Sequence, residues 1–266
     1  VADTLKRKYG MNPLCVKFAP FMYNEIGREN WEAFGQHFDT MEIRPRGLLH
    51  RKLARLCFEY LGDPFQPFVW GQLAAPMRVA AMTGIQLVCW GENAEAEYGG
   101  DPSANDKPCW DGTEWDRVYL KGAGAEKILL LGRELGAIGE AEYARASPFY
   151  IQPWSLAEPH EPEFHWLGYY LPWHPMGNFY AAVEHTGFKP NPERSEGTYS
   201  KLASLDDKLD GLHYRFSYLK FGLGRATSDA AQQVRAGDIT REEALALVAK
   251  YDAEKPTKYL AECLDY

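Results

Sequence analysis

The residues whose types and spacing best suit chemistry lie between positions 85 and 101, in the stretch IQLVCWGENAEAEYGGD. Its apolar part, residues 85–90, has the length of one buried strand and stops at Gly91. Three carboxylates follow: Glu92, Glu95 and Glu97. In an open α/β sheet ligands bind beyond the carboxyl ends of the strands. Because neighbouring carboxylates repel one another, this group suits a cation, a proton or a basic partner, and the alternative is a solvated acidic turn.

A second candidate site surrounds two glycines near the C-terminal end. Lys220 and Arg225 flank Gly222 and Gly224, just after an apolar segment. A flexible backbone with one lysine and one arginine suits phosphate binding, because the lysine acts as a point charge and the arginine as a bidentate donor. Alternatively, the basic residues face the dipole at the end of a helix.

The elements that must position these residues alternate between helix and strand in the first third of the chain. Periodicity predicts helices at 3–9, 23–38, 47–61 and 71–83, and strands at 12–20, 39–45 and 85–90, with a loop at 63–68. Such alternation is typical of right-handed βαβ units and a parallel sheet.

The pattern weakens after residue 101, where only a helix at 126–135 is predicted before a proline-rich stretch. We interpret 102–162 as an insertion, either a lid or a partner-docking subdomain. A strand at 163–173 and helices at 179–186, 212–221 and 244–251 follow, with a polar segment at 191–210, a capping box opening at Thr240 and a last helix after Pro256. The predicted domains are a core at 1–101, the insertion at 102–162, and the rest of the core with a helical C-terminal region at 163–266.

Composition excludes several functional classes. The net charge of −8 over 266 residues argues against a nucleic-acid partner, which needs a basic face. The sequence has no apolar run near the roughly 20 residues that span a bilayer, and no signal peptide, so we expect no membrane insertion. The five cysteines are scattered without CxxC spacing, which favours reduced thiols in the cytoplasm and no zinc site.

Short segments in a fixed order along the chain carry a resemblance to a known family. They are NPLCV at 12–16, HRKL at 50–53, GDPFQPF at 62–68, GEN at 91–93 with Glu95, EYGG at 97–100, EHTGF at 184–188, PERSEGTYSK at 192–201, ASLDDK at 203–208, KFG at 220–222 with GRAT at 224–227, and TREE at 240–243. The ordered set resembles the N-acetyl sugar amidotransferase family of bacterial surface-polysaccharide biosynthesis.

The resemblance implies a three-layer parallel sheet of the adenine-nucleotide α-hydrolase (HUP) type, as in ATP pyrophosphatases. It also implies conversion of an acetamido group on a nucleotide-activated sugar to an acetamidino group, with ATP and Mg²⁺. In this reaction ATP adenylylates the amide oxygen, and ammonia from a glutaminase–cyclase pair then displaces AMP. The family's glycine-rich loop of the SGGKDS type would lie immediately before Val1, so we expect this sequence to be part of a longer protein.

The resemblance also assigns candidate roles to residues. For catalysis these are Glu92, Glu95, Glu97, Lys220 and Arg225, and for Mg²⁺ they are Glu92 and Glu95. For ATP they are Val16, Lys17 and Phe18, whose backbone would hold the adenine, together with Gly91, Asn93 and Lys220. For the sugar nucleotide they are His50, Tyr98, Arg194, Ser195, Thr198, Tyr199 and Lys201.

Less specific interpretations stay open for several of these residues. The segment 193–201 is equally consistent with a capped surface loop. His50, next to Arg51 and Lys52, is also consistent with a solvated basic face. Asp206 and Asp207 form either a second carboxylate pair or a solvated helix start.

Two alternative functions also remain open. One is a non-catalytic protein that binds sugar nucleotides or organises a complex without the ATP loop. The other keeps the fold but thiolates or amidates nucleic-acid bases, and the acidic charge balance argues against it.

Overall fold

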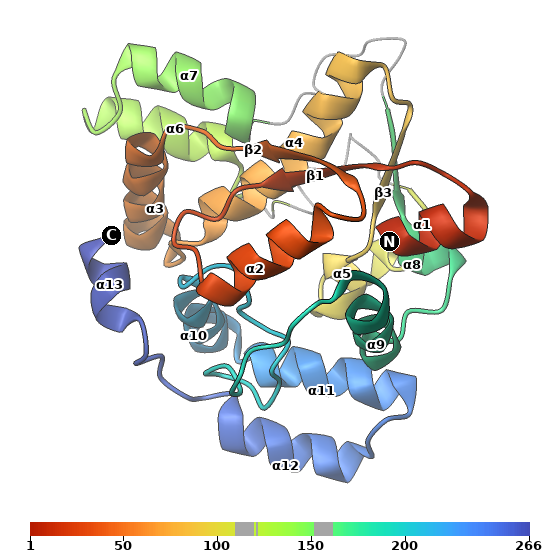
Figure 1. Cartoon of the computed structure of the whole chain (residues 1–266). Helices are drawn as coiled ribbons and strands as arrows, with labels where there is room; N and C mark the ends of the chain where they lie inside the picture. Colours follow the sequence, from red (N-terminus) through yellow and green to blue (C-terminus); the bar gives the residue numbers. More distant parts are fainter. Residues whose placement is uncertain (110–119, 121, 152–161) are drawn as a thin grey trace. The chain divides into compact units, whose positions relative to one another are not determined.

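The computed structural model describes residues 1–109, 120, 122–151 and 162–266 (Figure 1). The chain divides into two compact units. Unit 1 comprises Val1, Leu14–Ala19 and Thr40–Pro172, and unit 2 comprises Ala2–Pro13, Pro20–Asp39 and Trp173–Tyr266. Parts of the predicted insertion, at 110–119, 121 and 152–161, lie outside the described residues.

Unit 1 contains short strands and several helices. Its elements are β1 (Leu14–Phe18), β2 (Asp39–Ile43), α3 (Gly47–Leu61), α4 (Gln66–Thr83), β3 (Leu87–Trp90), α5 (Ala94–Glu97), η1 (Pro102–Ala104), α6 (Ala125–Glu134), α7 (Glu140–Tyr150), β4 (Glu163–Trp166) and α8 (Leu167–Tyr170). β1 pairs with β2, and β3 pairs in parallel with β4, with Leu87 opposite Glu163. The second pair packs on α4, where Met77 and Ala80 meet Val88, Phe164 and Trp166.

An aromatic core fills unit 1 around Phe18, the last residue of β1. Its ring centroid lies 6.0 Å from that of Phe68 and 5.8 Å from that of Tyr150. Gly71 of α4 faces the same ring so closely that an added Cβ would collide with it. The glycine therefore lets α4 pack against β1.

Unit 2 is helical. Its elements are α1 (Ala2–Tyr9), α2 (Glu25–Phe34), α9 (Pro175–Thr186), α10 (Asp210–Phe221), α11 (Arg225–Ala236), α12 (Arg241–Tyr251) and α13 (Leu260–Asp265). α11 and α12 pack against each other. Asp252, which follows α12, caps the start of α11: its carboxylate accepts from Gly224 N at 2.9 Å and from Thr227 N at 2.9 Å. A Cβ on Gly224 would lie 2.5 Å from this carboxylate, so the glycine admits the cap.

Most of the predicted elements are confirmed, including the helix at 47–61 and the capping box at Thr240. The loop at 63–68 is wrong in its second half, because Pro67 stands in the first turn of α4, where its missing N–H costs nothing. The strand at 163–173 is too long, since it ends at Trp166 and α8 follows. Helices α5, α7 and α11 were not predicted.

The fold is mixed α/β, as the alternation of elements predicts. The described residues form two two-stranded sheets, and the continuous three-layer sheet stays a prediction. All five cysteines are free thiols. No helix in the described ranges has both the length and the apolar character to cross a bilayer.

Candidate functional site

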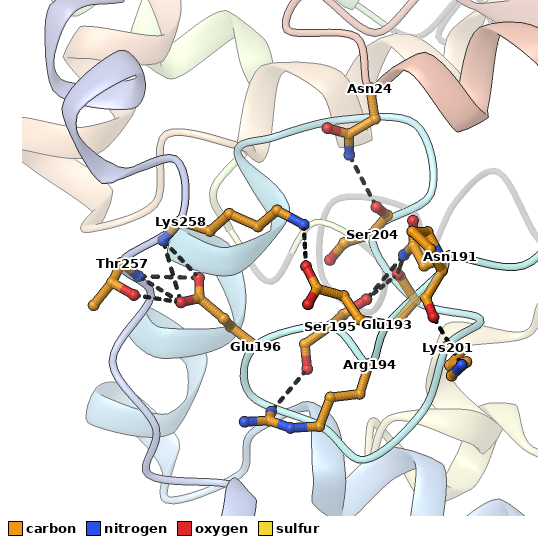
Figure 2. A network of polar contacts seen from close by, with 12 residues as sticks. Asn24, Asn191, Glu193, Arg194, Ser195, Glu196, Lys201, Ser204, Thr257 and Lys258 are labelled. Carbon is orange, nitrogen blue, oxygen red and sulfur yellow. Dashed lines mark hydrogen bonds and ion pairs between the residues drawn. The ribbon is translucent and has the colours of Figure 1, made fainter.

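Unit 2 contains a pocket of about 370 Å³, which we call the polar pocket (Figure 2). Charged and amide side chains dominate its lining, with a few apolar residues among them. The lining residues are Asn24, Asn191, Glu193, Arg194, Ser195, Glu196, Ser204, Asp207, Lys208, Gly211, Leu212, Glu254, Pro256, Lys258, Tyr259, Leu260 and Cys263. The wall thus combines the residue before α2, the polar segment 191–210, the start of α10 and the residues around the start of α13.

Main-chain pairing builds one wall of the polar pocket. Asn24 N donates to Asp206 O at 3.1 Å, and Lys208 N donates to Met22 O at 2.9 Å. Gly27, in the first turn of α2, lies against the same segment, where an added Cβ would come within 2.5 Å of Asp206 Cα. These contacts fix the start of α2 beside the segment that precedes α10.

Asp207 is a buried carboxyl in this wall, with an exposed fraction of 2%. Its Oδ1 accepts from Leu209 N at 2.9 Å and its Oδ2 from Phe21 N at 3.3 Å. Burial, reinforced by the negative charge of Asp206, raises the pKa of Asp207 to about 7, although the backbone hydrogen bonds oppose the shift. Asp207 is therefore a carboxyl that can hold or release a proton near neutral pH.

The segment 193–201 is tied to the rest of unit 2 mainly through Arg194. Its guanidinium forms a bidentate ion pair with Glu254, with both N–O distances at 2.7 Å, and lies 4.8 Å from the centre of the Tyr251 ring. Glu254 also accepts from Gly197 N at 2.8 Å. Beside it, the Glu196 carboxylate accepts from the backbone after α12 (Figure 2). These contacts match the interpretation of this segment as a capped loop.

The other predicted sugar-nucleotide residues of this segment also bond within unit 2. Ser195 Oγ donates to Ala203 O at 2.6 Å, Thr198 Oγ1 to Asp229 Oδ2 at 2.5 Å, Tyr199 OH to Gln233 Oε1 at 3.0 Å, and Lys201 Nζ to Pro192 O at 2.8 Å. Only Arg194 and Ser195 of the predicted set line the polar pocket. Their role in binding sugar nucleotide stays a prediction.

The two predicted phosphate contacts lie on different helices. Lys220 is exposed in the last turn of α10, as the helix-dipole alternative expects. Arg225 is the first residue of α11, and its Nε donates to Asp229 Oδ1 at 2.8 Å. Its guanidinium also lies 5.5 Å from the centre of the Tyr214 ring. Arg225 therefore stabilises the start of α11, and phosphate binding by either residue stays a prediction.

The three predicted glutamates belong to unit 1, at the short helix α5. Asn93 Oδ1 caps this helix by accepting from Glu95 N at 3.1 Å, and Glu97 Oε1 accepts from Asn93 N at 2.9 Å. Glu95 is 3% exposed, and its carboxylate accepts from Asp101 N. An added Cβ on Gly100 would collide with that carboxylate. Glu95 and Glu97 thus hold the turn together, and a solvated acidic turn is wrong for Glu95, which is buried.

The remaining members of this stretch are half-buried: Gly91, Glu92, Asn93 and Tyr98. Within the described residues, no group of three or more His, Cys, Asp or Glu side chains is arranged to hold a metal ion. Magnesium usually takes only one or two carboxylates and completes its shell with phosphate oxygens and water. Mg²⁺ binding by Glu92 and Glu95 therefore stays a prediction.

The predicted adenine-binding residues and His50 lie in unit 1, with Phe18 and His50 in its core. Val16 and Lys17 are half-buried in β1, and Phe18 is 3% exposed. His50 is 1% exposed, and its Nδ1 lies 2.8 Å from Tyr150 OH. Burial lowers the pKa of His50 to about 3, so the ring is neutral. A solvated basic face is therefore wrong for His50, although the neighbouring Arg51 and Lys52 are exposed.

Sequence reasoning missed the pocket residues outside the recognised segments. Asn24 and Glu254 line the polar pocket, but neither stands in a motif. The available signal for Asn24 is its residue type near the start of the helix predicted at 23–38, because asparagine is a common cap. That signal predicts a helix start and says nothing of a ligand.

Residues 196–266 match the family model of the C-terminal domain of WbpG-like lipopolysaccharide biosynthesis proteins. No match is found among curated proteins. The matched segment spans α10 to α13 and supplies most of the residues that line the polar pocket. The C-terminal part of this chain is thus similar to the C-terminal domain of proteins of lipopolysaccharide biosynthesis.

Proposed function

We propose that this protein is an ATP-dependent amidotransferase of surface-glycan biosynthesis, which converts an acetamido group of a nucleotide-activated sugar to an acetamidino group. The observation that carries the proposal is the match of residues 196–266 to WbpG-like lipopolysaccharide biosynthesis proteins. The ordered resemblance to N-acetyl sugar amidotransferases along the rest of the chain supports the reaction type.

The proposed reaction has two balanced steps. The amide oxygen attacks the α-phosphorus of ATP, so that an O–P bond forms and pyrophosphate leaves. Ammonia then adds to the activated carbon, the C–O bond to AMP breaks, and one proton is released. Bound Mg²⁺ supplies charge neutralisation at the phosphates. Burial raises the pKa of Asp207, which lines the polar pocket, to about 7, and this value suits accepting a proton near neutral pH.

The proposal includes a fold and a location in the cell. We propose that β1–β2 and β3–β4 belong to a layered sheet of the HUP type, and that the protein works in the cytoplasm with a glutaminase–cyclase pair as its source of ammonia. The mixed α/β character of unit 1 supports this fold. The experiments below use the full-length protein.

The direct test incubates the full-length protein with ATP, Mg²⁺, ammonium and a nucleotide-activated diacetamido sugar acid. We expect AMP and pyrophosphate in equal amounts, and a sugar product in which one acetamido oxygen is replaced by nitrogen. The control is the same nucleotide sugar with hydroxyls in place of the acetamido groups, which should release no AMP. The proposal fails if a folded, ATP-binding protein releases no AMP with any acetamido sugar nucleotide.

A second assay tests the source of ammonia. With glutamine in place of ammonium, AMP release should require the glutaminase–cyclase pair, because free glutamine gives no ammonia by itself. Equal rates with glutamine in the presence and absence of that pair would contradict the proposed partnership and leave the ammonium-dependent reaction standing.

A further inference from the structure

The side chain of Asn24 has an unusual position in the polar pocket. Asn24 is the residue before α2, with extended backbone angles (φ −83°, ψ 148°), and an asparagine there usually accepts a hydrogen bond from the first turn. Asn24 makes no such bond. Instead its Nδ2 donates to Ser204 O at 3.0 Å (Figure 2), which fixes the amide and assigns its two ends.

The other end of this amide, Asn24 Oδ1, is a buried acceptor without a donor among the described residues. The whole residue is 6% exposed and lines the polar pocket. Nearly all buried polar atoms in folded proteins have a hydrogen-bond partner, because an unpaired one is costly. An acceptor held in this way suits a ligand that brings an N–H or O–H donor.

The charges of the polar pocket favour a neutral ligand group over a phosphate. Each of its three cationic side chains is already paired with a carboxylate. The pairs are Arg194 with Glu254 at 2.7 Å, Lys258 with Glu193 at 2.7 Å, and Lys208 with Glu262 at 2.6 Å. A phosphate would have to compete with these carboxylates, whereas a neutral polar ring would not.

The size and the lining of the polar pocket also favour a neutral sugar ring as its ligand. A pocket of about 370 Å³ is within the range of small-molecule sites and has room for one sugar ring. Tyr259, Leu212 and Pro256 add apolar surface to the lining, which suits the C–H faces of such a ring.

We propose that the polar pocket binds the acetamido-bearing ring of the sugar nucleotide, with the acetamido N–H donating to Asn24 Oδ1. The identity of this ligand rests on the proposed function. The diphosphate of the sugar nucleotide then lies outside the polar pocket, because the cations in its lining are paired. Asn24 is thus a specificity-determining residue that selects a donor group at this position of the sugar.

The test measures binding without turnover, in the absence of ATP. The full-length protein is titrated with the methyl glycoside of an N-acetylated hexosamine, and with the matching methyl hexoside that has an acetoxy group in place of the acetamido group and so offers no donor there. We expect the acetamido glycoside to bind about tenfold more tightly, because one hydrogen bond to a buried acceptor is gained. Asn24→Ala should reduce this preference to about threefold or less.

Asn30→Ala is the matched control. Asn30 belongs to α2, which Asn24 precedes, and both ends of its amide are paired with Lys189, at 2.8 Å each. It does not line the polar pocket. Its replacement should leave the preference unchanged even if it lowers stability. A preference that survives in Asn24→Ala, or a wild-type protein that binds the two glycosides equally, would overturn the inference.

If the Asn24→Ala variant does not fold, a measurement on the wild-type protein still tests the inference. In the wild-type protein, the side-chain amide resonance of Asn24 should shift on titration with the acetamido glycoside, and that of Asn30 should not. An unshifted Asn24 resonance at saturation would contradict the assignment. If the wild type releases AMP but Asn24→Ala keeps the preference for the acetamido glycoside, this inference alone is refuted. If Asn24→Ala loses that preference but the wild type releases no AMP, the proposed function alone is refuted.

Discussion

Replacing Asp207 by asparagine should flatten the pH dependence of the protein's stability. The carboxyl is 2% exposed, and its pKa is raised from an ordinary 3.8 to about 7, chiefly by burial. The folded protein therefore holds this proton more tightly than the unfolded chain does. The stabilisation is fully present below the unfolded pKa, decreases as pH rises, and is lost above the folded pKa.

The two pKa values set the magnitude of this effect. Their difference corresponds to about 4 kcal/mol over the whole range, since one pH unit is worth about 1.4 kcal/mol. About 2 kcal/mol of this falls between roughly pH 5.5 and pH 8, where the protein can be handled. Asp210 is also buried, and burial together with the charges of Asp206 and Asp207 raises its pKa. Removing the charge of Asp207 therefore also weakens the pH dependence that Asp210 contributes.

The assay is urea unfolding of the wild type and Asp207→Asn at a series of pH values. Asparagine cannot accept from both Leu209 N and Phe21 N, so the variant should be less stable at low pH, where Asp207 is protonated. The informative quantity is the slope: wild-type stability should fall toward pH 8 by about 2 kcal/mol more than that of the variant. Asp265→Asn, at an exposed position of α13, controls for the loss of one negative charge. Parallel curves for wild type and Asp207→Asn would refute the assigned burial.

Three further predictions concern other contacts of the fold. Asp252→Ala should lower the unfolding free energy by about 2–3 kcal/mol, because it removes the acceptor for Gly224 N and Thr227 N at the start of α11. Denaturant titration measures this loss of stability. A change below about 0.5 kcal/mol would contradict the role of Asp252 as a cap. Thr240→Ala should cost about 1 kcal/mol through the capping box of α12, and recovery in Thr240→Ser would identify the hydroxyl as the cause. The His50 ring should show no titration in NMR spectra between roughly pH 5 and pH 8, since burial lowers its pKa to about 3, and a midpoint near 6.5 would place the ring in solvent.

Where the sequence predicted the structure well, the signals were local. The helix at 47–61 ends at Gly62, which adopts a left-handed conformation (φ 63°), and α4 ends at Gly84 in the same way (φ 73°). A glycine can adopt these angles wherever it stands, so the end of each helix depends on neighbouring residues alone. The capping box at Thr240 is likewise formed within a single turn.

Where the sequence led to a wrong prediction, the environment of the residue depends on residues far away in the chain. Arg225 stood beside flexible glycines in the sequence, but it begins α11, whose start is capped by Asp252 from 25 or more positions away. His50 stood among basic residues, but it packs beneath Tyr150, which lies 100 positions further along the chain. Neither partner follows from local periodicity.

The sequence by itself determined the existence and order of most helices and strands, and the C-terminal ends of several helices. Its recognisable segments also determined the direction of the functional proposal. Only the tertiary structure decided which polar side chains bond to one another and which face a pocket. Arg194 meets Glu254 and Asn24 meets Ser204 across 60 and 180 positions. The physical reason is that helix ends depend on backbone angles fixed by a few neighbouring residues, whereas burial, pairing and pKa depend on atoms that only the folded chain brings together.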